Sequence, residues 1–407
     1  MTASTRSRHR AAGSNPPRER RRGLTLVELL VAIAIISILA TLLLGVAAQA
    51  GQTAREARTK SIVSRLHTLI VERMEEYREV RAELNQRTER DAPEPDWRDL
   101  LDNQGPDSFD VLNDQQRLAL GRLFALRERQ KMEMPDRWSD VACNAIDTAA
   151  PPNPPLVEPP NNYDYFPRYV SERPPLNRLY YRKLVEIYDR TNTLTGAVNT
   201  PAEILTNESA ECLYLTVMNA TADGEARGLF KATDSGDTDG DGALEFLDAW
   251  GQPIGWIRWP AGYESDLQWS FTRLVDQFEN PPVGQTGEDV VQQTLDDNHD
   301  PLDRFRVDRT NLPSFSEPGA PQYEFATGEN GRGWKLTPLI YSWGLDGGVG
   351  MWTGLQLGGS AEFQTANANS DPYVGDPTAA IPDLPLGTIT DREAATDNIT
   401  NHVIEAR

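Results

Sequence analysis

The residues from Leu24 to Ala50 form an unbroken apolar run with a single charged side chain, Glu28. A helix that crosses a bilayer needs about 20 apolar residues, so this run is long enough to span a membrane. A secretory signal peptide has a shorter apolar region, of about 7–15 residues, before its cleavage site. The run therefore predicts a membrane-spanning helix over residues 24–50, in preference to a signal peptide that is removed after Ala48 or Ala50.

Electric charge differs on the two sides of this run. Residues 1–23 carry seven arginines and one glutamate, a net charge of +6, so the remaining residues must carry −27 for the whole chain to reach −21. Basic residues flanking a span stay on the cytoplasmic side, which places the N-terminus in the cytoplasm and the acidic remainder across the membrane. The acidic balance also argues against a nucleic-acid binder, because phosphate binding needs a basic surface.

Glu28 is the anomaly in the run. A carboxylate inside a hydrocarbon span costs about 2.5 kcal/mol or more, so it indicates a function and requires a partner. Cleavage between Gly23 and Leu24 would create a new α-amine four residues before Glu28, about one helical turn away. The same amine on a neighbouring copy could also reach this carboxylate.

The segment around that bond, Arg-Arg-Arg-Gly23 followed by Leu24-Thr-Leu-Val-Glu28-Leu-Leu, resembles the class III signal of type IV pilins and type II secretion pseudopilins. The resemblance implies that a membrane prepilin peptidase cuts after Gly23 and methylates Leu24, where the family consensus has phenylalanine. It also implies that Glu28 neutralises the amine of Leu24 in the adjacent subunit. The alternative is a plain signal anchor with a chance glutamate.

A second pattern predicts that the same helix continues through residues 51–90. Apolar residues recur at three- and four-residue spacing on one face, and charged residues fill most of the other face. Pro93 and Pro95 cannot continue a helix. A helix from about Leu26 to Gln86 would be roughly 90 Å long, at ~1.5 Å per residue. The apolar positions are Ile62, Leu66, Leu69, Ile70, Met74, Tyr77, Val80 and Leu84.

The rest of the chain divides into two regions. Residues 91–225 predict a mainly helical insertion, with helices at 114–132, 176–188 and from Thr200 to about Met218, and a proline-rich loop at 150–175. Thr200, Pro201 and Glu203 have the capping-box pattern of a helix start. Residues 226–407 predict a β-rich head, with strands at 254–259 and 339–343, weak fragments at 262–335 and a loop at 360–395.

The expected fold class is therefore α+β. The family resemblance implies a pilin-like ladle, with a cleaved basic leader at residues 1–23, a long N-terminal transmembrane helix, an inserted mainly helical region and a small antiparallel β-sheet head.

An acidic loop at residues 237–248 matches the calcium-loop pattern D-x-D-x-D-G. Carboxylates occupy loop positions one, three, five, nine and twelve, and a glycine at position six permits the sharp turn. Hard oxygen ligands in a flexible all-protein cage favour calcium. An EF-hand has a bidentate glutamate where this loop has an aspartate, and the alternative is a solvated Asp-Gly turn. The predicted ligands are Asp237, Asp239, Asp241, the backbone carbonyl of Ala243, Glu245 and Asp248.

Three short segments, at residues 247–254, 341–347 and 397–401, resemble parts of the major type II pseudopilins. In those proteins the last region forms a stabilising calcium loop, so the resemblance adds Asp346 and Asp397 as secondary candidate ligands. Residues 88–200 have no counterpart in the family. Size favours a minor, tip-like subunit whereas these segments favour the major type, and both subtypes stay open.

Catalytic motifs are missing from the sequence. It contains no G-x-S-x-G, H-E-x-x-H or phosphate-loop lysine motif, and its four histidines are scattered. We therefore expect no enzymatic activity. Cys143 and Cys212 leave open either one disulfide or two separate buried thiols.

These patterns together predict a structural subunit of a type II secretion-like pseudopilus or a type IV pilus-like filament. The expected protein crosses the inner membrane once, with its head in the periplasm or outside the cell. Its expected partners are prepilin peptidase, other pilin or pseudopilin subunits and the inner membrane, and its expected cofactor is calcium. The alternative is a membrane-anchored surface binding or adhesion protein that uses the pilin signal only for export.

Overall fold

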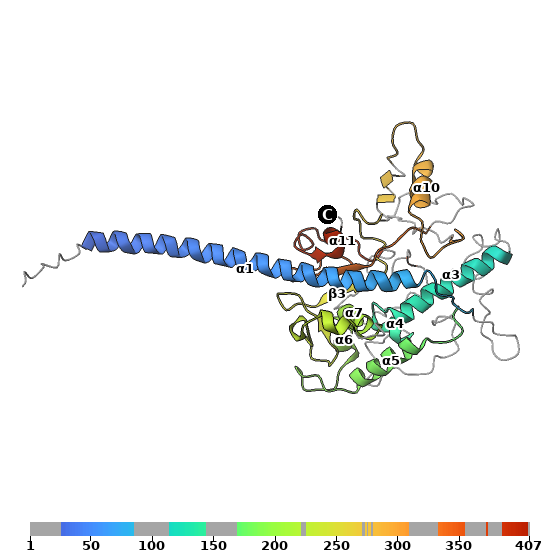
Figure 1. Cartoon of the computed structure of the whole chain (residues 1–407), viewed down its shortest axis with the longest axis horizontal. Coiled ribbons are helices and arrows are strands. Elements are labelled where there is room, and N and C mark those ends of the chain that lie inside the picture. The colour runs from blue at the N-terminus through green and yellow to red at the C-terminus, as the bar shows by residue number, and fades with distance from the viewer. Residues whose placement is uncertain are drawn as a thin grey trace, which may run out of the picture. The chain divides into compact units, whose positions relative to one another are not determined.

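The computed structural model describes residues 26–84, 114–143, 169–220, 225–270, 273–274, 276–277, 280–308, 333–354, 372 and 385–405 (Figure 1). The chain divides into two compact units, residues 1–54 and 55–407, and the first helix contributes residues to both. The predicted leader, most of the proline-rich loop at 150–175 and most of the loop at 360–395 lie outside the described residues.

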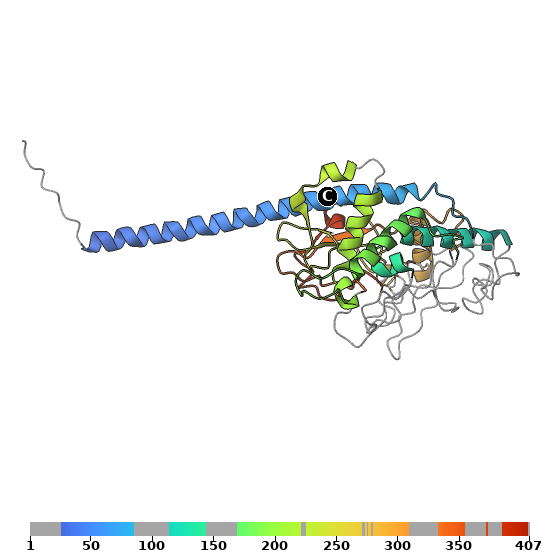
Figure 2. The ribbon, with the colours of Figure 1, turned by 90° about the horizontal axis from the view of Figure 1, so that it is seen from below.

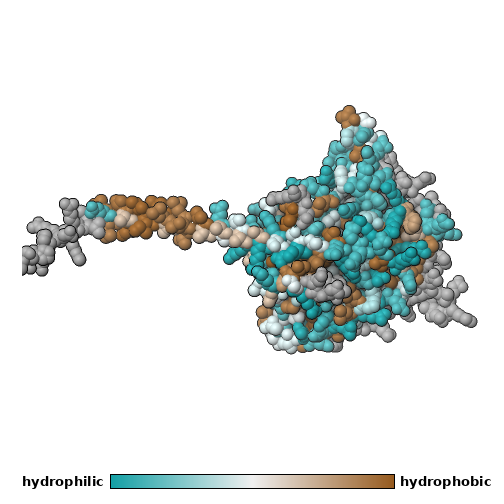
Figure 3. Space-filling view, viewed as in Figure 1, coloured by the Kyte–Doolittle hydropathy of each residue, from teal (hydrophilic) through white to brown (hydrophobic). Residues whose placement is uncertain are grey.

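Helix α1 runs from Leu26 to Glu76. Its residues 26–50 are exposed throughout and almost entirely apolar, which Figure 3 shows as a brown surface. By length and composition, α1 is the one helix among the described residues that could cross a membrane. This agrees with the span predicted for residues 24–50, of which the first two residues lie outside the described part.

The predicted end of this helix, near Gln86, is wrong. The helix ends at Glu76, and the next three residues form a turn. The hydroxyl of Tyr77 donates a hydrogen bond to Oε2 of Glu133 (2.6 Å), and Leu84 forms an antiparallel bridge with Val170. These tertiary contacts take the chain out of the helix, although its apolar spacing continues.

The main core of the second unit forms between the last turns of α1 and a small sheet. Ile62, Val63, Leu66 and Ile70 of α1 are buried in one cluster with side chains of the sheet and of helix α7 (Glu208–Ala220). Each fully buried aliphatic side chain contributes roughly 1.5–3 kcal/mol. The cluster members from the sheet are Ile254, Trp256, Ile340 and Ile399, those from α7 are Leu213 and Val217, and Phe246 joins them from the second strand pair.

The sheet has three antiparallel strands in the order β3-β4-β5: β3 (Ile254–Ile257), β4 (Leu339–Ser342) and β5 (Ile399–Thr400). Trp256 is paired with Ile340, so the two strands expected from the sequence form one ladder. A second pair joins β1 (Ser235–Gly236), which directly precedes the acidic loop, to β2 (Glu245–Phe246), which lies within residues 237–248. Helix α11 (Asn401–Glu405) follows β5 directly and lies beside the second half of α1 (Figure 2).

Most of the remaining helices lie before the sheet in sequence. They are α3 (Asp114–Glu133), α4 (Trp138–Ala142), α5 (Pro175–Tyr188), α6 (Pro201–Ile204), α7 (Glu208–Ala220) and α8 (Glu225–Leu229), followed by the short 3₁₀ helix η1 (Ala232–Asp234). Helix α10 (Gly287–Asp297) lies later, between β3 and β4. The composition of helices and small antiparallel sheets makes the fold α+β, as expected.

Two features of this region differ from the sequence prediction. The helix expected from Thr200 to about Met218 is two helices, because Asn207 adopts a positive φ of 60° between α6 and α7. Helix α10 lies in a stretch where only weak fragments were expected, and Thr286 caps it by accepting a hydrogen bond from the backbone N–H of Asp289. Cys143 and Cys212 are both free and buried, which fits the separate-thiol alternative.

Candidate functional site

The processing motif is described only from Leu26 onward, so Gly23 and Leu24 lie outside the described residues. Glu28 lies in the first turn of α1 and is exposed. A carboxylate in the first helical turn interacts favourably with the partial positive charge of the free N–H groups there. Around it, the side chains of Leu29, Leu30 and Val31 are also exposed, so the carboxylate sits within an uncovered apolar surface.

The acidic loop between β1 and β2 is shaped by its first aspartate. The Asp237 carboxylate accepts hydrogen bonds from the backbone N–H groups of Gly240 (2.6 Å) and Gly242 (3.1 Å). Both glycines have positive φ, 81° and 98°, a conformation that other residues rarely adopt. The sharp turn expected at Gly242 is therefore present in the structure.

A neighbouring segment holds the loop from its backbone side. Side chains between α5 and α6 donate to three consecutive carbonyl groups: Asn192 to Asp239 (3.2 Å), Thr193 to Gly240 (3.4 Å) and Asn199 to Asp241 (2.7 Å). Nη1 of Arg190 donates to the carbonyl of Gly242 (2.9 Å). These hydrogen bonds fix the backbone of the loop against the neighbouring segment. The carboxylates of the loop do not take part in them.

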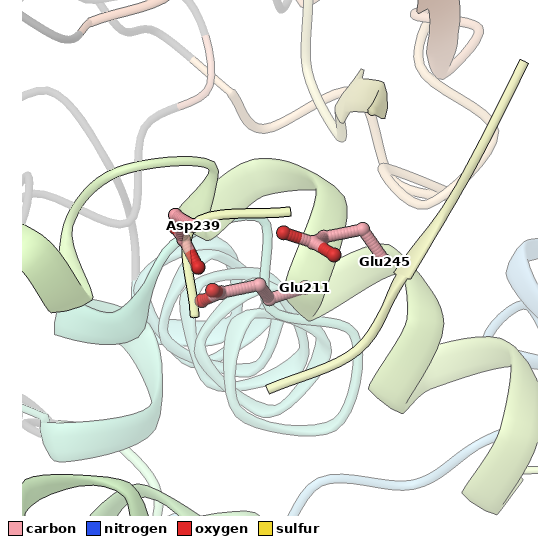
Figure 4. Close-up of side chains that lie close together, drawn as sticks. All are labelled: Glu211, Asp239 and Glu245. Carbon is pink, nitrogen blue, oxygen red and sulfur yellow. The ribbon is translucent and has the colours of Figure 1, made fainter. Parts of the chain in front are cut away.

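Those carboxylates converge in two overlapping groups. Asp237, Asp239 and Asp241 form one group, and Asp239 and Glu245 form the other together with Glu211 of α7. Within each group, one oxygen from every residue lies within 4.8 Å of the others. Figure 4 shows the carboxylates of Glu211, Asp239 and Glu245 pointing toward one another. The sequence reading missed Glu211, which lies 26 residues before Asp237 on a separate helix.

Asp248, the twelfth loop residue, lies outside both groups. Its Oδ1 accepts hydrogen bonds from the backbone N–H groups of Trp250 (2.8 Å) and Gln252 (2.9 Å), and its Oδ2 accepts one from Ser342 on β4 (2.7 Å). The carboxylate expected to close the loop thus joins the loop end to the sheet. Ala243 lies in the loop, where its N–H donates to Oδ1 of Asp241 (2.7 Å).

Burial and mutual repulsion make this cluster electrostatically unfavourable by itself. Loss of solvent, followed by the charges of neighbouring acids, raises the pKa of Asp239 to about 6, that of Asp241 to about 7 and that of Glu245 to about 8. The same two causes raise the pKa of Glu211 well above its usual value. Such shifts mark a group of acids that needs protons or a cation.

The two secondary candidates are close to each other, at the turn that follows β4. Oδ2 of Asp397 accepts hydrogen bonds from the backbone N–H groups of Leu345 (2.6 Å) and Asp346 (3.1 Å). Oδ1 of Asp346 accepts one from Gly348 (2.7 Å). Asp397 therefore caps this turn, and the two carboxylates do not belong to either convergent group of acids among the described residues.

Comparison with known proteins identifies the N-terminal segment. Residues 18–44 match the family model described as the prokaryotic N-terminal methylation motif. A search of the curated proteins and a search of the solved structures each found no match. The matched residues contain the expected cleavage site, Glu28 and the first part of the apolar helix. The chain therefore carries the N-terminal methylation motif that type IV pilins and pseudopilins share.

Proposed function

We propose that this protein is a structural subunit of a pilin-like filament, either a type II secretion-like pseudopilus or a type IV pilus-like fibre. The observation that carries the proposal is the prepilin-type motif at residues 18–44, continued by an apolar helix whose side chains are exposed from Leu26 to Ala50. A helix that is apolar all round is stable only when lipid or other helices cover it. A membrane covers it before assembly, and neighbouring subunits cover it in a filament.

In this proposal, prepilin peptidase removes residues 1–23 and methylates Leu24. The new α-amine then lies one turn from Glu28 on the same helix, or beside Glu28 of an adjacent subunit. A buried ion pair of this kind lowers the cost of placing a carboxylate in an apolar environment. Glu28 thus gives the helix a fixed register when it packs into the filament.

The arginine-rich leader supports the orientation. Seven arginines precede Leu24, and basic residues next to a span remain cytoplasmic. The unit formed by residues 55–407 then lies in the periplasm or outside the cell. We propose no catalytic activity for the head.

Intact-mass measurement of the chain, with and without co-expressed prepilin peptidase, tests the processing step. Wild-type protein should lose residues 1–23 and gain one methyl group on Leu24 only when the peptidase is present. Gly23→Val should keep the leader, because a branched side chain replaces the residue next to the cut bond. Gly13→Val, the same change ten residues upstream in the leader, should be processed normally.

A wild-type chain that keeps its leader, or that is cut after Ala48 or Ala50, would contradict the proposal. A chain that is processed normally but never enters a filament would favour the surface-binding alternative, in which the signal serves only for export.

A further inference from the structure

Two buried carboxylate oxygens near the acidic loop have no hydrogen-bond partner among the residues that the structure describes. Glu211 and Asp241 are both fully buried, with 0% of their surface exposed. Oε2 of Glu211 accepts a hydrogen bond from the indole nitrogen of Trp138 (2.5 Å), and Oδ1 of Asp241 accepts one from Ala243, but Oε1 of Glu211 and Oδ2 of Asp241 are unsatisfied. A buried polar atom without a partner is costly, so each of these oxygens calls for a ligand.

The unsatisfied oxygens belong to the convergent carboxylates. Glu211 faces Asp239 and Glu245, with one oxygen of each residue within 4.8 Å of the others (Figure 4). Oxygens that bind one calcium ion at 2.3–2.6 Å lie no more than about 5 Å apart. The three carboxylates are therefore close enough to share one ion. Asp237 and Asp241 form the second group together with Asp239, which belongs to both groups.

The hydrogen bonds that reach these acids come from neutral groups. Glu245 accepts hydrogen bonds from the backbone N–H and the hydroxyl of Thr238, and Asp241 accepts one from the backbone N–H of Ala243. Nη1 of Arg190 donates to the carbonyl of Gly242 (2.9 Å). Neutral donors cannot balance the charge of several ionised carboxylates, whereas a divalent cation can.

We propose that this cluster is a calcium site in which Glu211 of α7 takes the closing position that an EF-hand loop gives to its twelfth residue. The ion is held by Glu211, Asp239 and Glu245, with Asp237 and Asp241 adding charge from within the loop. An all-oxygen set rich in carboxylates suits calcium, whereas magnesium usually keeps several waters and takes one or two carboxylates. The inference is independent of the filament function proposed above.

Calcium bound in this way would join two elements of the core. Glu211 lies on the helix that also carries Leu213 and Val217, and Glu245 begins the strand that carries Phe246. All three apolar residues belong to the main core cluster. Because a ligand that binds only the folded state stabilises it, calcium should raise the midpoint of thermal unfolding.

Calorimetric titration of the full-length protein in detergent, after removal of metal with EGTA, tests the site. Calcium should bind with one ion per chain and more tightly than magnesium. Glu211→Gln keeps an acceptor for Trp138 but removes the charge, and it should weaken calcium binding by about tenfold or more. Asp241→Asn should weaken it in the same direction. The matched control is Asp248→Asn, a loop acid outside the cluster, which should bind calcium about as tightly as wild type.

Thermal unfolding of the same proteins separates loss of the site from loss of the fold. In EGTA, Glu211→Gln should unfold at the same temperature as wild type or higher, because it relieves buried repulsion, and it should lose most of the calcium-induced increase. The proposal is overturned if wild type binds no calcium at millimolar concentration, or if magnesium binds equally well. It is also overturned if Asp248→Asn loses binding while Glu211→Gln keeps it.

Discussion

Asn401, the first residue of α11, places its side-chain nitrogen 2.8 Å from Nδ1 of His67 on α1. The same amide serves β4: its oxygen accepts a hydrogen bond from the N–H of Ile340, and its nitrogen donates to the carbonyl of Pro338, both at 2.8 Å. One side chain thus joins the end of the chain to the sheet and to the long helix. This gives a structural role to the segment 397–401, which the sequence singled out only by family resemblance.

Replacing Asn401 by alanine should destabilise the second unit. The substitution leaves the buried N–H of Ile340 without its partner, whereas the carbonyl of Pro338 keeps its contact with Nε2 of His402. Because an unsatisfied buried group costs about 1–3 kcal/mol, we expect a loss of that size in urea unfolding. Asn280→Ala removes an exposed hydrogen bond to Asp276 and should change stability by less than about 0.5 kcal/mol. Equal effects of the two changes would refute this role of Asn401.

Arg258, the residue after β3, lies in a buried ionic cluster. Its Nη2 contacts Oδ2 of Asp140 (2.8 Å) and its Nη1 donates to the carbonyl of Met134 (2.6 Å). Burial by itself would raise the pKa of Asp136, but the guanidinium groups of Arg258 and Arg137 hold it well below its usual range. The arginine and aspartate charges of this cluster therefore stabilise one another in the protein interior.

Arg258→Met should therefore cost about 3–5 kcal/mol of stability, because it leaves Asp136 and Asp140 buried with part of their compensation removed. Arg304→Met is the matched control, since Arg304 pairs with Glu79 at an exposed site where ion pairs contribute about 0–1 kcal/mol. Urea unfolding of both variants measures the difference. A loss below about 1 kcal/mol for Arg258→Met would show that the cluster adapts without its guanidinium.

Protonation of His402 should cause part of the acid sensitivity of the fold. Burial lowers its pKa to about 4, against opposing hydrogen bonds to the carbonyls of Pro338 and Thr337, and repulsion by His67 adds to the decrease. Its Nδ1 lies 2.7 Å from the hydroxyl of Ser265, and the ring of Tyr263 packs edge-on against it. The folded protein therefore holds this histidine neutral.

The unfolded chain binds a proton at His402 below about pH 6.5 and the folded chain only below about pH 4, so the stabilising contribution is complete above pH 6.5 and decreases as the pH falls toward 4. The decrease amounts to about 3 kcal/mol at most. Urea unfolding at a series of pH values should show a flatter profile for His402→Gln than for wild type over this interval. Parallel profiles would show that other groups cause the acid sensitivity.

Local sequence signals predicted several elements well. The capping box at Thr200 is present in full: its hydroxyl accepts from the N–H of Glu203 (3.3 Å), and the Glu203 carboxylate accepts from the N–H of Thr200 (2.8 Å). The continuation of that helix was predicted less well. Asn207 interrupts it, and its side-chain amide bonds to Thr238, Asp239 and Glu245, residues more than 30 positions later that no local pattern reveals.

The acidic site, too, could be predicted from the sequence only in part. The spacing of Asp237, Asp239, Asp241 and Glu245 identified the loop, because those residues are contiguous. Contiguity also suggested Asp248, but the structure joins that residue to Ser342 on β4. In the sequence, Glu211 is only an acid between Ala210 and Cys212, which are both buried in the structure. Its place in the site could therefore be recognised only from the tertiary structure.

We propose that the N-terminal helix assembles the protein into a filament through Glu28. Co-sedimentation of full-length protein with sheared filaments from the native host tests this role, with Glu28→Ala compared with wild type. Glu72→Ala, which removes an exposed carboxylate from the same helix outside the apolar run, is the control. Wild type and Glu72→Ala should sediment with filaments, while Glu28→Ala should stay in the membrane. Retention of all three proteins in the membrane would contradict this role, and the N-terminal helix would then be an export anchor only.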